Sequence, residues 1–218
     1  MDGRNPDLDH EASRVRDMPA PRKSEGAAGG AMQRIFAWPY RLALAFLLWT
    51  GVRPWQLTLL SLALNVAVGA LIITGDWFVA GTLLVFAGLF DVFDGSVARQ
   101  RGEEKRSGAF MDSVLDRVSD AILFSCLFWT LASNGQEFEA SLALITLVVS
   151  LSVSHVRAEA EAVGVALTEG FFQRLERFLA LMAGLLIPGA MRPVLILLTV
   201  LGGVTLLQRS WSAVQDAR

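Results

Sequence analysis

The stretch from Trp55 to Gly75 contains no charged residue, and it constrains the fold of this chain more than any other feature. As an α-helix rising about 1.5 Å per residue, it is long enough to cross the hydrocarbon core of a membrane, about 30 Å thick. The composition agrees, because 53% of the 218 residues are hydrophobic and only 18% are charged, which is unusual for a soluble domain. We therefore expect an all-α membrane protein.

Further apolar segments follow, separated by polar or turn-forming pieces, at about 77–98, 108–133, 138–156, 172–189 and 193–210. Together with the first they predict six transmembrane helices in one domain, residues 54–218. Several segments reach full length only by including aspartates or arginines at one end. Because isolated charges are costly in lipid, those ends must face protein or water. The sequence therefore predicts a polar cavity inside the helical domain.

The residues before this domain divide into two parts. Residues 1–30 mix charges, prolines and glycines without an apolar period, which predicts a disordered tail. Residues 31–53 are largely apolar but include Pro39 and Arg41. We expect an interfacial amphipathic helix there, with a membrane span as the alternative.

The cations are unevenly distributed between alternate loops. Loops 99–107 and 157–177 are rich in Arg and Lys, whereas 75–76 and 134–138 contain neither and 189–192 contains only Arg192. The positive-inside rule places the cation-rich side in the cytoplasm. We expect the protein in the inner or plasma membrane, with its active site facing the cytoplasm. The net charge of −2 gives no basic field for nucleic acid.

Four aspartates in residues 91–116 form two helical pairs, within the pattern D-x2-D-G-x2-A-R-x8-G-x3-D-x3-D. Asp91 and Asp94 are i, i+3, and Asp112 and Asp116 are i, i+4, so each pair shares one helix face. Both pairs lie near the cytoplasmic ends of consecutive antiparallel spans, where they can converge. Hard oxygen ligands without His or Cys favour Mg²⁺, Mn²⁺ or Ca²⁺ over zinc. The sequence thus predicts a divalent-metal site.

The alternative for these aspartates is a set of helix caps and surface ion pairs. It would explain any one of them, but it explains poorly four at this spacing in apolar helices. Asp120 extends the same helix face by another i+4 step. We expect it to pair with Arg117 or to support the metal ligands from behind.

Small and cationic residues accompany the aspartates. Gly95 and Gly108 remove side-chain bulk where a ligand could approach a helix backbone, and Ala98 keeps the same face narrow. Arg99 is a permanent forked donor suited to a phosphate oxygen or to an aspartate. The alternative for Arg99 is a snorkelling cation on the cytoplasmic side, whose guanidinium reaches the membrane surface.

The complete pattern resembles the signature of the CDP-alcohol phosphotransferase (CDP-alcohol phosphatidyltransferase) family at every fixed position. The similarity extends over about residues 50–190, and Pro54 followed by Thr58 looks like the family's Pro-x-x-x-Thr element. The resemblance implies a six-span, homodimeric, Mg²⁺-dependent enzyme of phospholipid biosynthesis. Such an enzyme transfers a phosphatidyl-type group from a CDP-linked lipid, here CDP-diacylglycerol, to a small alcohol and releases CMP.

The resemblance also implies roles for individual residues. Two Mg²⁺ ions, with Mn²⁺ as the alternative, would be held by Asp91, Asp94, Asp112 and Asp116. Asp116 would in addition take the proton of the acceptor hydroxyl. The CDP-lipid would be bound by Thr58, Gly95, Ala98, Arg99 and Gly108.

Two segments, SHVRAEAEAVG at 154–164 and FQRLER at 172–177, resemble the bacterial phosphatidylinositol-phosphate synthase branch, where basic residues grip the phosphate of the acceptor. The matching residues here are Arg157, Arg174 and Arg177. The sequence departs from that branch at Glu159, usually arginine, and at Leu175, usually proline. The alternative for the arginines is membrane anchoring, with Glu159, Glu161 and Glu176 as partners.

Three functions follow as hypotheses. The first is a synthase that uses CDP-diacylglycerol and inositol phosphate, and the second is a phosphatidylglycerophosphate synthase that uses glycerol 3-phosphate. The third, from another class, is a divalent-cation transporter that uses the same carboxylates. A cation path does not require the glycines, Ala98 or Arg99, and an arginine beside it would oppose cations.

Overall fold

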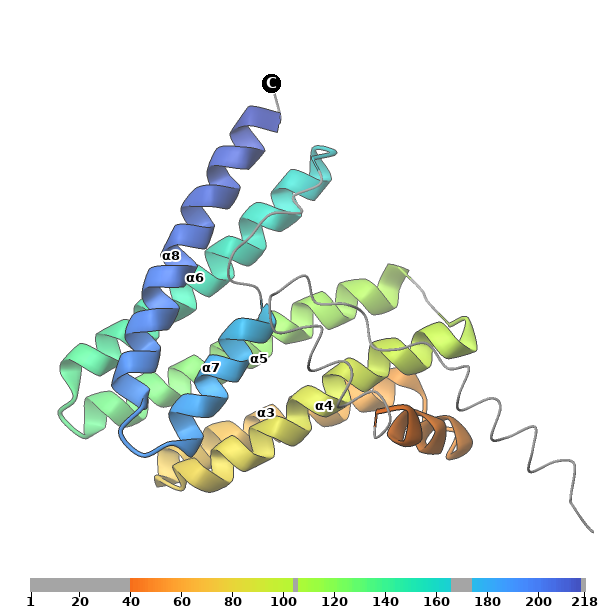
Figure 1. Cartoon of the computed structure of the whole chain (residues 1–218), viewed down its shortest axis with the longest axis horizontal. Coiled ribbons are helices and arrows are strands. Elements are labelled where there is room, and N and C mark those ends of the chain that lie inside the picture. The colour runs from red at the N-terminus through yellow and green to blue at the C-terminus, as the bar shows by residue number, and fades with distance from the viewer. Residues whose placement is uncertain (1–39, 104–105, 166–173, 217–218) are drawn as a thin grey trace, which may run out of the picture.

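The computed structural model describes residues 40–103, 106–165 and 174–216, and its regular secondary structure there is entirely helical (Figure 1). The all-α prediction is therefore confirmed for these ranges. The predicted tail, 1–30, and the first part of the predicted interfacial segment, 31–39, lie outside the described residues.

Each predicted span corresponds to one helix, preceded by a short apolar helix, Tyr40–Trp49. The others are α3 (Pro54–Thr74), α4 (Trp77–Arg101), α5 (Arg106–Ser133), α6 (Glu137–Ala162), α7 (Arg174–Leu186) and α8 (Met191–Asp216). Helices α4 and α6 continue past their predicted ends at 98 and 156, to Arg101 and Ala162. The apolar pattern stops earlier than the helix does, since the last turns consist mainly of polar and small residues.

Four of the helices, α3, α4, α6 and α8, are long and apolar enough to cross a membrane. Helix α5 has sufficient length, but it carries Asp112, Asp116, Arg117 and Asp120 between its start and its middle. The described part of α7 has 13 residues. The structure thus supports a membrane protein with at least four candidate spans, and the count of six stays a prediction.

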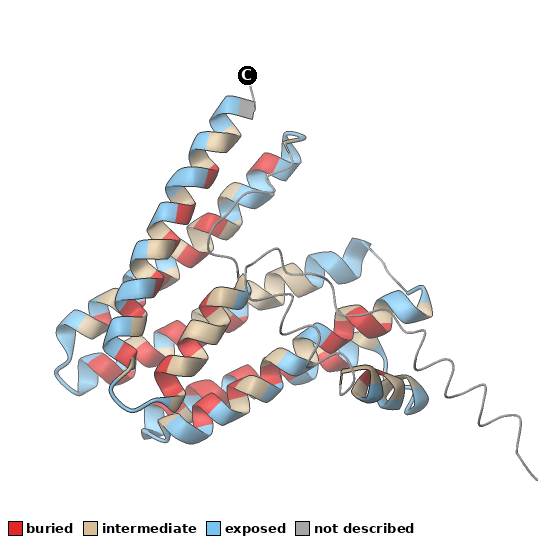
Figure 2. Ribbon diagram, in the orientation of Figure 1, coloured by how far each residue is buried: buried red, intermediate tan, exposed pale blue. Residues whose placement is uncertain are grey.

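The six long helices pack as a ring. Helix α3 packs on α4 and α5, α5 on α6, α6 on α8, α8 on α7, and α7 on α4. Each helix contributes to a buried apolar cluster, seen as red bands in Figure 2, which includes Val68, Leu84, Leu127, Ala143, Leu181 and Leu195. Within the described ranges, α4 and α5 do not pack on each other. Side chains from these two helices can therefore meet across the space between them.

The Tyr40–Trp49 helix docks on the C-terminal half of α4 and the start of α3. Leu44 is buried with Leu57, Phe93 and Val97 in a second apolar cluster. The rings of Tyr40 and Phe93 stack, with centroids 5.2 Å apart. This short helix is thus fixed to the end of α4 that carries the signature motif.

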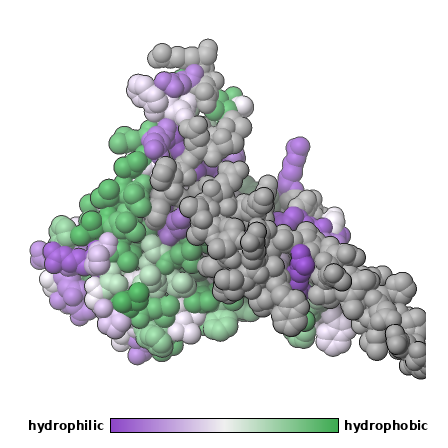
Figure 3. Space-filling model, in the orientation of Figure 1, coloured by the Kyte–Doolittle hydropathy of each residue, from purple (hydrophilic) through white to green (hydrophobic). Residues whose placement is uncertain are grey.

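Large apolar side chains also cover the outside of the ring. On α8 they include Ile196, Leu197, Val200, Val204 and Leu207, and Figure 3 shows hydrophobic residues spread over this side of the molecule. An exposed apolar surface of this extent is unusual in water but suits contact with lipid tails.

Candidate active site

Three of the four predicted metal ligands converge in the structure. Carboxylate oxygens of Asp91, Asp112 and Asp116 lie within 4.8 Å of one another. Asp91 is on α4 and the other two are on α5, so these carboxylates meet between two helices that do not pack together. Three half-buried carboxylates this close repel one another unless a cation lies between them.

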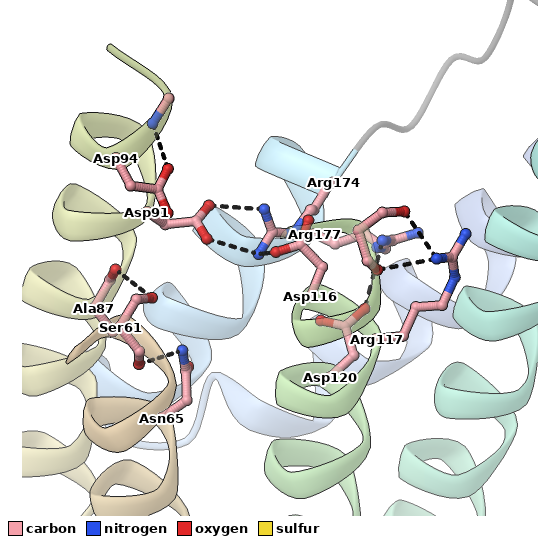
Figure 4. Close-up of polar contacts among 12 residues, drawn as sticks. Ser61, Asn65, Ala87, Asp91, Asp94, Asp116, Arg117, Asp120, Arg174 and Arg177 are labelled. Atoms are coloured by element: carbon pink, nitrogen blue, oxygen red, sulfur yellow. Dashed lines mark hydrogen bonds and ion pairs between the residues drawn. The ribbon is translucent and has the colours of Figure 1, made fainter. Parts of the chain in front are cut away.

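Asp94, the fourth predicted ligand, lies outside this group of three. Its side chain is buried, and its Oδ1 accepts a hydrogen bond from the N–H of Gly95 (Figure 4). Its Oδ2 is buried and has no hydrogen-bond partner among the described residues. A buried carboxylate oxygen without a partner is costly, and a bound cation would satisfy it. The donor set, all carboxylate oxygens, fits a hard divalent cation.

Arg174 is the cation that the structure places between the aspartates. Its Nη1 lies 2.7 Å from Asp91 Oδ2, and its Nη2 lies 2.5 Å from Asp116 Oδ1 (Figure 4). The arginine begins α7 and so connects a third helix to α4 and α5. Arg174 was predicted to lie at the phosphate of an acceptor, and its contact with the two aspartates could not be predicted from the sequence.

A second polar cluster lies one turn further along α5, around Asp120. Arg177, whose side chain is 10% exposed, lies 3.5 Å from Asp120 Oδ2, which also accepts a hydrogen bond of 2.7 Å from the Ser150 hydroxyl. Arg117 instead donates to Ser113 on its own helix and to the carbonyl of Ser154 on α6. The expected pairing of Asp120 with Arg117 is therefore not found, because the Asp120 carboxylate contacts Arg177 and Ser150 instead. Its position behind the aspartate group agrees with a supporting role.

Arg157 has an exposed environment on α6. Its Nε pairs with Glu161 at 2.8 Å, one helical turn away, and His155 lies 3.9 Å from Glu159 in the same way. The pair of Arg157 with Glu161 is one that the anchoring alternative expects. Of the three arginines, Arg174 contacts the aspartate group and Arg177 contacts Asp120.

The residues expected at the CDP-lipid come from three helix ends. Thr58, in the first turns of α3, donates to the carbonyl of Pro54 at 3.2 Å. Ala98 is half-buried near the end of α4. Gly108 is exposed at the start of α5, and a Cβ there would meet nothing within 4 Å. The start of α5 is thus open to a ligand.

Arg99 and Gly95 lie against each other on α4. A Cβ added to Gly95 would come within 3.3 Å of Arg99 Nη1, so the missing side chain makes room for the guanidinium. Nη2 of Arg99 donates to the hydroxyl of Ser96 at 2.9 Å, and this hydroxyl also accepts from Tyr40. Sequence reasoning missed Tyr40 and Ser96, since no spacing rule connects residues so far apart.

Arg209 is another residue that sequence reasoning missed. It is a buried arginine in α8, a helix with the length and hydropathy of a membrane span. A charge inside such a segment is a signal that could have found it, because intramembrane charges are usually functional.

The chain resembles known proteins over most of its length. The profile of the CDP-alcohol phosphatidyltransferase family matches residues 52–207. Phosphatidylinositol phosphate synthase of Mycobacterium tuberculosis is 38% identical over 141 residues, which are 63% of this chain and 64% of the relative. Archaetidylinositol phosphate synthase of Methanothermobacter thermautotrophicus is 35% identical over 159 residues, covering 70% of this chain and 78% of that protein. The first of these matches therefore spans slightly less than two thirds of its relative.

Solved structures agree with the sequence matches. The M. tuberculosis phosphatidylinositol phosphate synthase with CDP-DAG bound superposes with a TM-score of 0.72 at 32% identity, covering 78% of this chain and 91% of that one. The same enzyme in complex with manganese and citrate gives the same TM-score, with 78% and 87% covered. On the matched residues and the shared fold, the chain belongs to the CDP-alcohol phosphatidyltransferase family.

Proposed function

We propose that this protein is an integral-membrane phospholipid synthase that transfers a phosphatidyl group from CDP-diacylglycerol to an alcohol that carries a phosphate, with inositol phosphate as the first candidate. The observation that carries the proposal is the meeting of Asp91, Asp112 and Asp116 from two helices of the signature motif. The names of the relatives support the choice of acceptor.

In this proposal Asp91, Asp94, Asp112 and Asp116 hold two Mg²⁺ ions, for which Mn²⁺ can substitute. When bound, the metal would neutralise the diphosphate of the CDP-lipid and the leaving CMP. The buried, unpartnered Oδ2 of Asp94 supports this assignment. Manganese in the structure of the M. tuberculosis relative supports it as well.

Asp116 is the proposed base. The hydroxyl oxygen of the acceptor attacks the phosphorus that carries the diacylglycerol, the bond from that phosphorus to the oxygen of CMP breaks, and the hydroxyl proton goes to the Asp116 carboxylate. Arg174 donates to Asp116 and to Asp91, so it orients both carboxylates before substrate binds. Asp116 acts chiefly through its position, because a carboxylate is a weak base.

The proposed substrate contacts divide between the two substrates. Thr58, Gly95, Ala98, Arg99 and Gly108 line the site for the CDP-lipid, and the open start of α5 leaves space there. Arg174 and Arg177 lie one turn apart on α7 and contact carboxylates of α5, which supports a role for their guanidinium groups in binding the acceptor phosphate. Arg157 is the third candidate for this phosphate.

The wider arrangement is also part of the proposal. Six transmembrane helices and an interfacial helix place the aspartates at the cytoplasmic face, and the protein forms a homodimer. The membrane is the inner or plasma membrane. A cation transporter is disfavoured, because the guanidinium of Arg174 among the carboxylates would raise the barrier for a passing cation.

The proposal is tested with the purified full-length protein in mixed micelles with Mg²⁺. CDP-diacylglycerol is supplied with inositol phosphate, glycerol 3-phosphate, inositol, serine or no acceptor, and CMP release and the lipid product are measured. We expect CMP release with inositol phosphate and none without an acceptor. CMP release with glycerol 3-phosphate alone would replace inositol phosphate as the proposed acceptor. No CMP release with any acceptor would refute the proposed synthase function.

A further inference from the structure

The hydroxyl of Ser96 joins two residues that lie far apart in the sequence. Tyr40 donates its phenolic O–H to Ser96 Oγ at 2.5 Å, and Arg99 Nη2 donates to the same oxygen at 2.9 Å. Ser96 in turn donates its own proton to the carbonyl of Val92 at 2.9 Å. A serine hydroxyl offers one donor and two acceptor sites. All three are used, so the geometry of this junction is fully specified.

The position of Tyr40 is itself fixed by packing. Its ring stacks on Phe93, and its helix buries Leu44 against α3 and α4. At the other end of the short helix, Arg101 of α4 donates to the carbonyls of Gly51 and Leu48 at 3.3 and 3.4 Å. The Tyr40 hydroxyl therefore reaches Ser96 from a rigid element rather than from a loose segment.

Arg99 is the residue that gains from this arrangement. It is exposed, and an exposed arginine loses considerable rotamer freedom when it binds a ligand. Here Nη2 is held by Ser96 and the guanidinium lies over Gly95. Nε and Nη1 make no hydrogen bond within the described part of the chain, so they can donate to a phosphate oxygen.

We propose that Tyr40 is a positioning residue for the CDP-lipid: through Ser96 it holds the Arg99 guanidinium in the orientation that receives the diphosphate. The inference rests on the proposed function. Tyr40 lies outside the residues that the family profile matches, 52–207. The short helix before α3 thus contributes to the substrate site as well as to the membrane surface.

The test is steady-state CMP release by the full-length protein at saturating acceptor and Mg²⁺, with the surface fraction of CDP-diacylglycerol varied in mixed micelles. Tyr40→Phe keeps the stacking on Phe93 and removes only the hydroxyl. We expect its KM for CDP-diacylglycerol to rise about three- to tenfold, the usual effect of losing one hydrogen bond between neutral groups, with kcat within about twofold. Ser96→Ala should raise KM at least as much.

A matched control and a double variant distinguish two roles of Tyr40: positioning of Arg99 through Ser96, and docking of the Tyr40–Trp49 helix on α4. Thr50→Val removes another hydroxyl near the same helix, one that donates to the Leu47 carbonyl at 2.9 Å, and should leave KM unchanged. In an Arg99→Met background, Tyr40→Phe should cause no further rise in KM, because its effect passes through Arg99.

Two results would overturn the inference while leaving the synthase intact. One is a wild-type KM in both Tyr40→Phe and Ser96→Ala, and the other is an equal effect of Tyr40→Phe with and without Arg99. Absence of CMP release by the wild-type protein would instead refute the proposed function and this inference together.

Discussion

Arg174 contacts carboxylates from two helices that do not pack on each other, so one side chain connects three helices at the candidate site. Without it, Asp91, Asp112 and Asp116 would lie within a few ångströms of one another with no positive charge between them. The same position is the natural one for a divalent cation. At the scale of single residues, Arg174 and a metal therefore compete for the same oxygens.

This competition predicts the behaviour of Arg174→Met. Without metal, the variant should lose about 1–3 kcal/mol of stability, between the values for exposed and for buried ion pairs. The loss should shrink when Mn²⁺ is added, and the variant should bind Mn²⁺ more tightly than the wild type. Melting curves in EDTA and in Mn²⁺ measure both effects. Arg157→Met is the matched control, since Arg157 pairs with Glu161 on an exposed face, away from the aspartate group. An equal metal response in the two variants would contradict the prediction.

The second prediction at this scale concerns Asp116→Asn. The amide keeps the shape of the side chain but cannot take the proton, so CMP release should fall by about 10²–10⁴-fold, the usual contribution of a positioned base. The melting temperature should change little, because the loss of the pair with Arg174 is offset by weaker repulsion from Asp91 and Asp112. Asp76→Asn, in the exposed turn before α4, should retain full activity. Turnover near the wild-type rate in Asp116→Asn would remove Asp116 from this role.

At the scale of elements, the helices could be predicted from the sequence far better than their contacts. Apolar segments separated by polar or turn-forming pieces predicted the helices α3 to α8, and the i, i+4 spacing predicted that Asp112 and Asp116 share a face. The partner of Asp120 could not be predicted, because Arg117 is near in sequence whereas Arg177 comes close only once α7 has packed against α4. The junction of Tyr40 with Ser96 depends on tertiary packing for the same reason.

The packing of α7 on α4 leads to a prediction for Gly88. The ring of Phe178 on α7 lies directly over this glycine, so a Cβ there would overlap the ring. Gly88→Ala should displace α7 and with it Arg174, one helical turn from Phe178. We expect a loss of about 1–3 kcal/mol, as for other overpacked cores, together with reduced CMP release.

Gly203 on α8 provides the control for this prediction. A Cβ at Gly203 meets nothing within 4 Å, so Gly203→Ala should be neutral or slightly stabilising, because alanine favours helix. Thermal unfolding of the two variants side by side measures the difference. Equal melting temperatures would show that the contact of Phe178 with Gly88 does not hold α7 in place.

At the scale of the whole molecule, the ring of helices separates two environments. Apolar clusters fill the contacts between the helices, and apolar side chains also face outward. The carboxylates and arginines of the site come from the C-terminal half of α4, the N-terminal half of α5 and the start of α7. Arg174 contacts Asp91 and Asp116, so these three helix parts meet at one end of the ring.

That arrangement predicts the topology of the protein. Helix α5 has 28 residues, about 42 Å at 1.5 Å per residue, which exceeds the hydrocarbon thickness of about 30 Å. Its two ends should therefore lie on opposite sides, with the cation-rich end in the cytoplasm.

In a Cys126→Ser background, Glu103→Cys before α5 and Asn134→Cys after it each introduce one exposed thiol. A membrane-impermeant maleimide applied to intact cells should label Asn134→Cys only, and permeabilised cells should show labelling of both. Labelling of Glu103→Cys alone in intact cells would reverse the orientation, and labelling of both would mean that α5 does not cross the membrane.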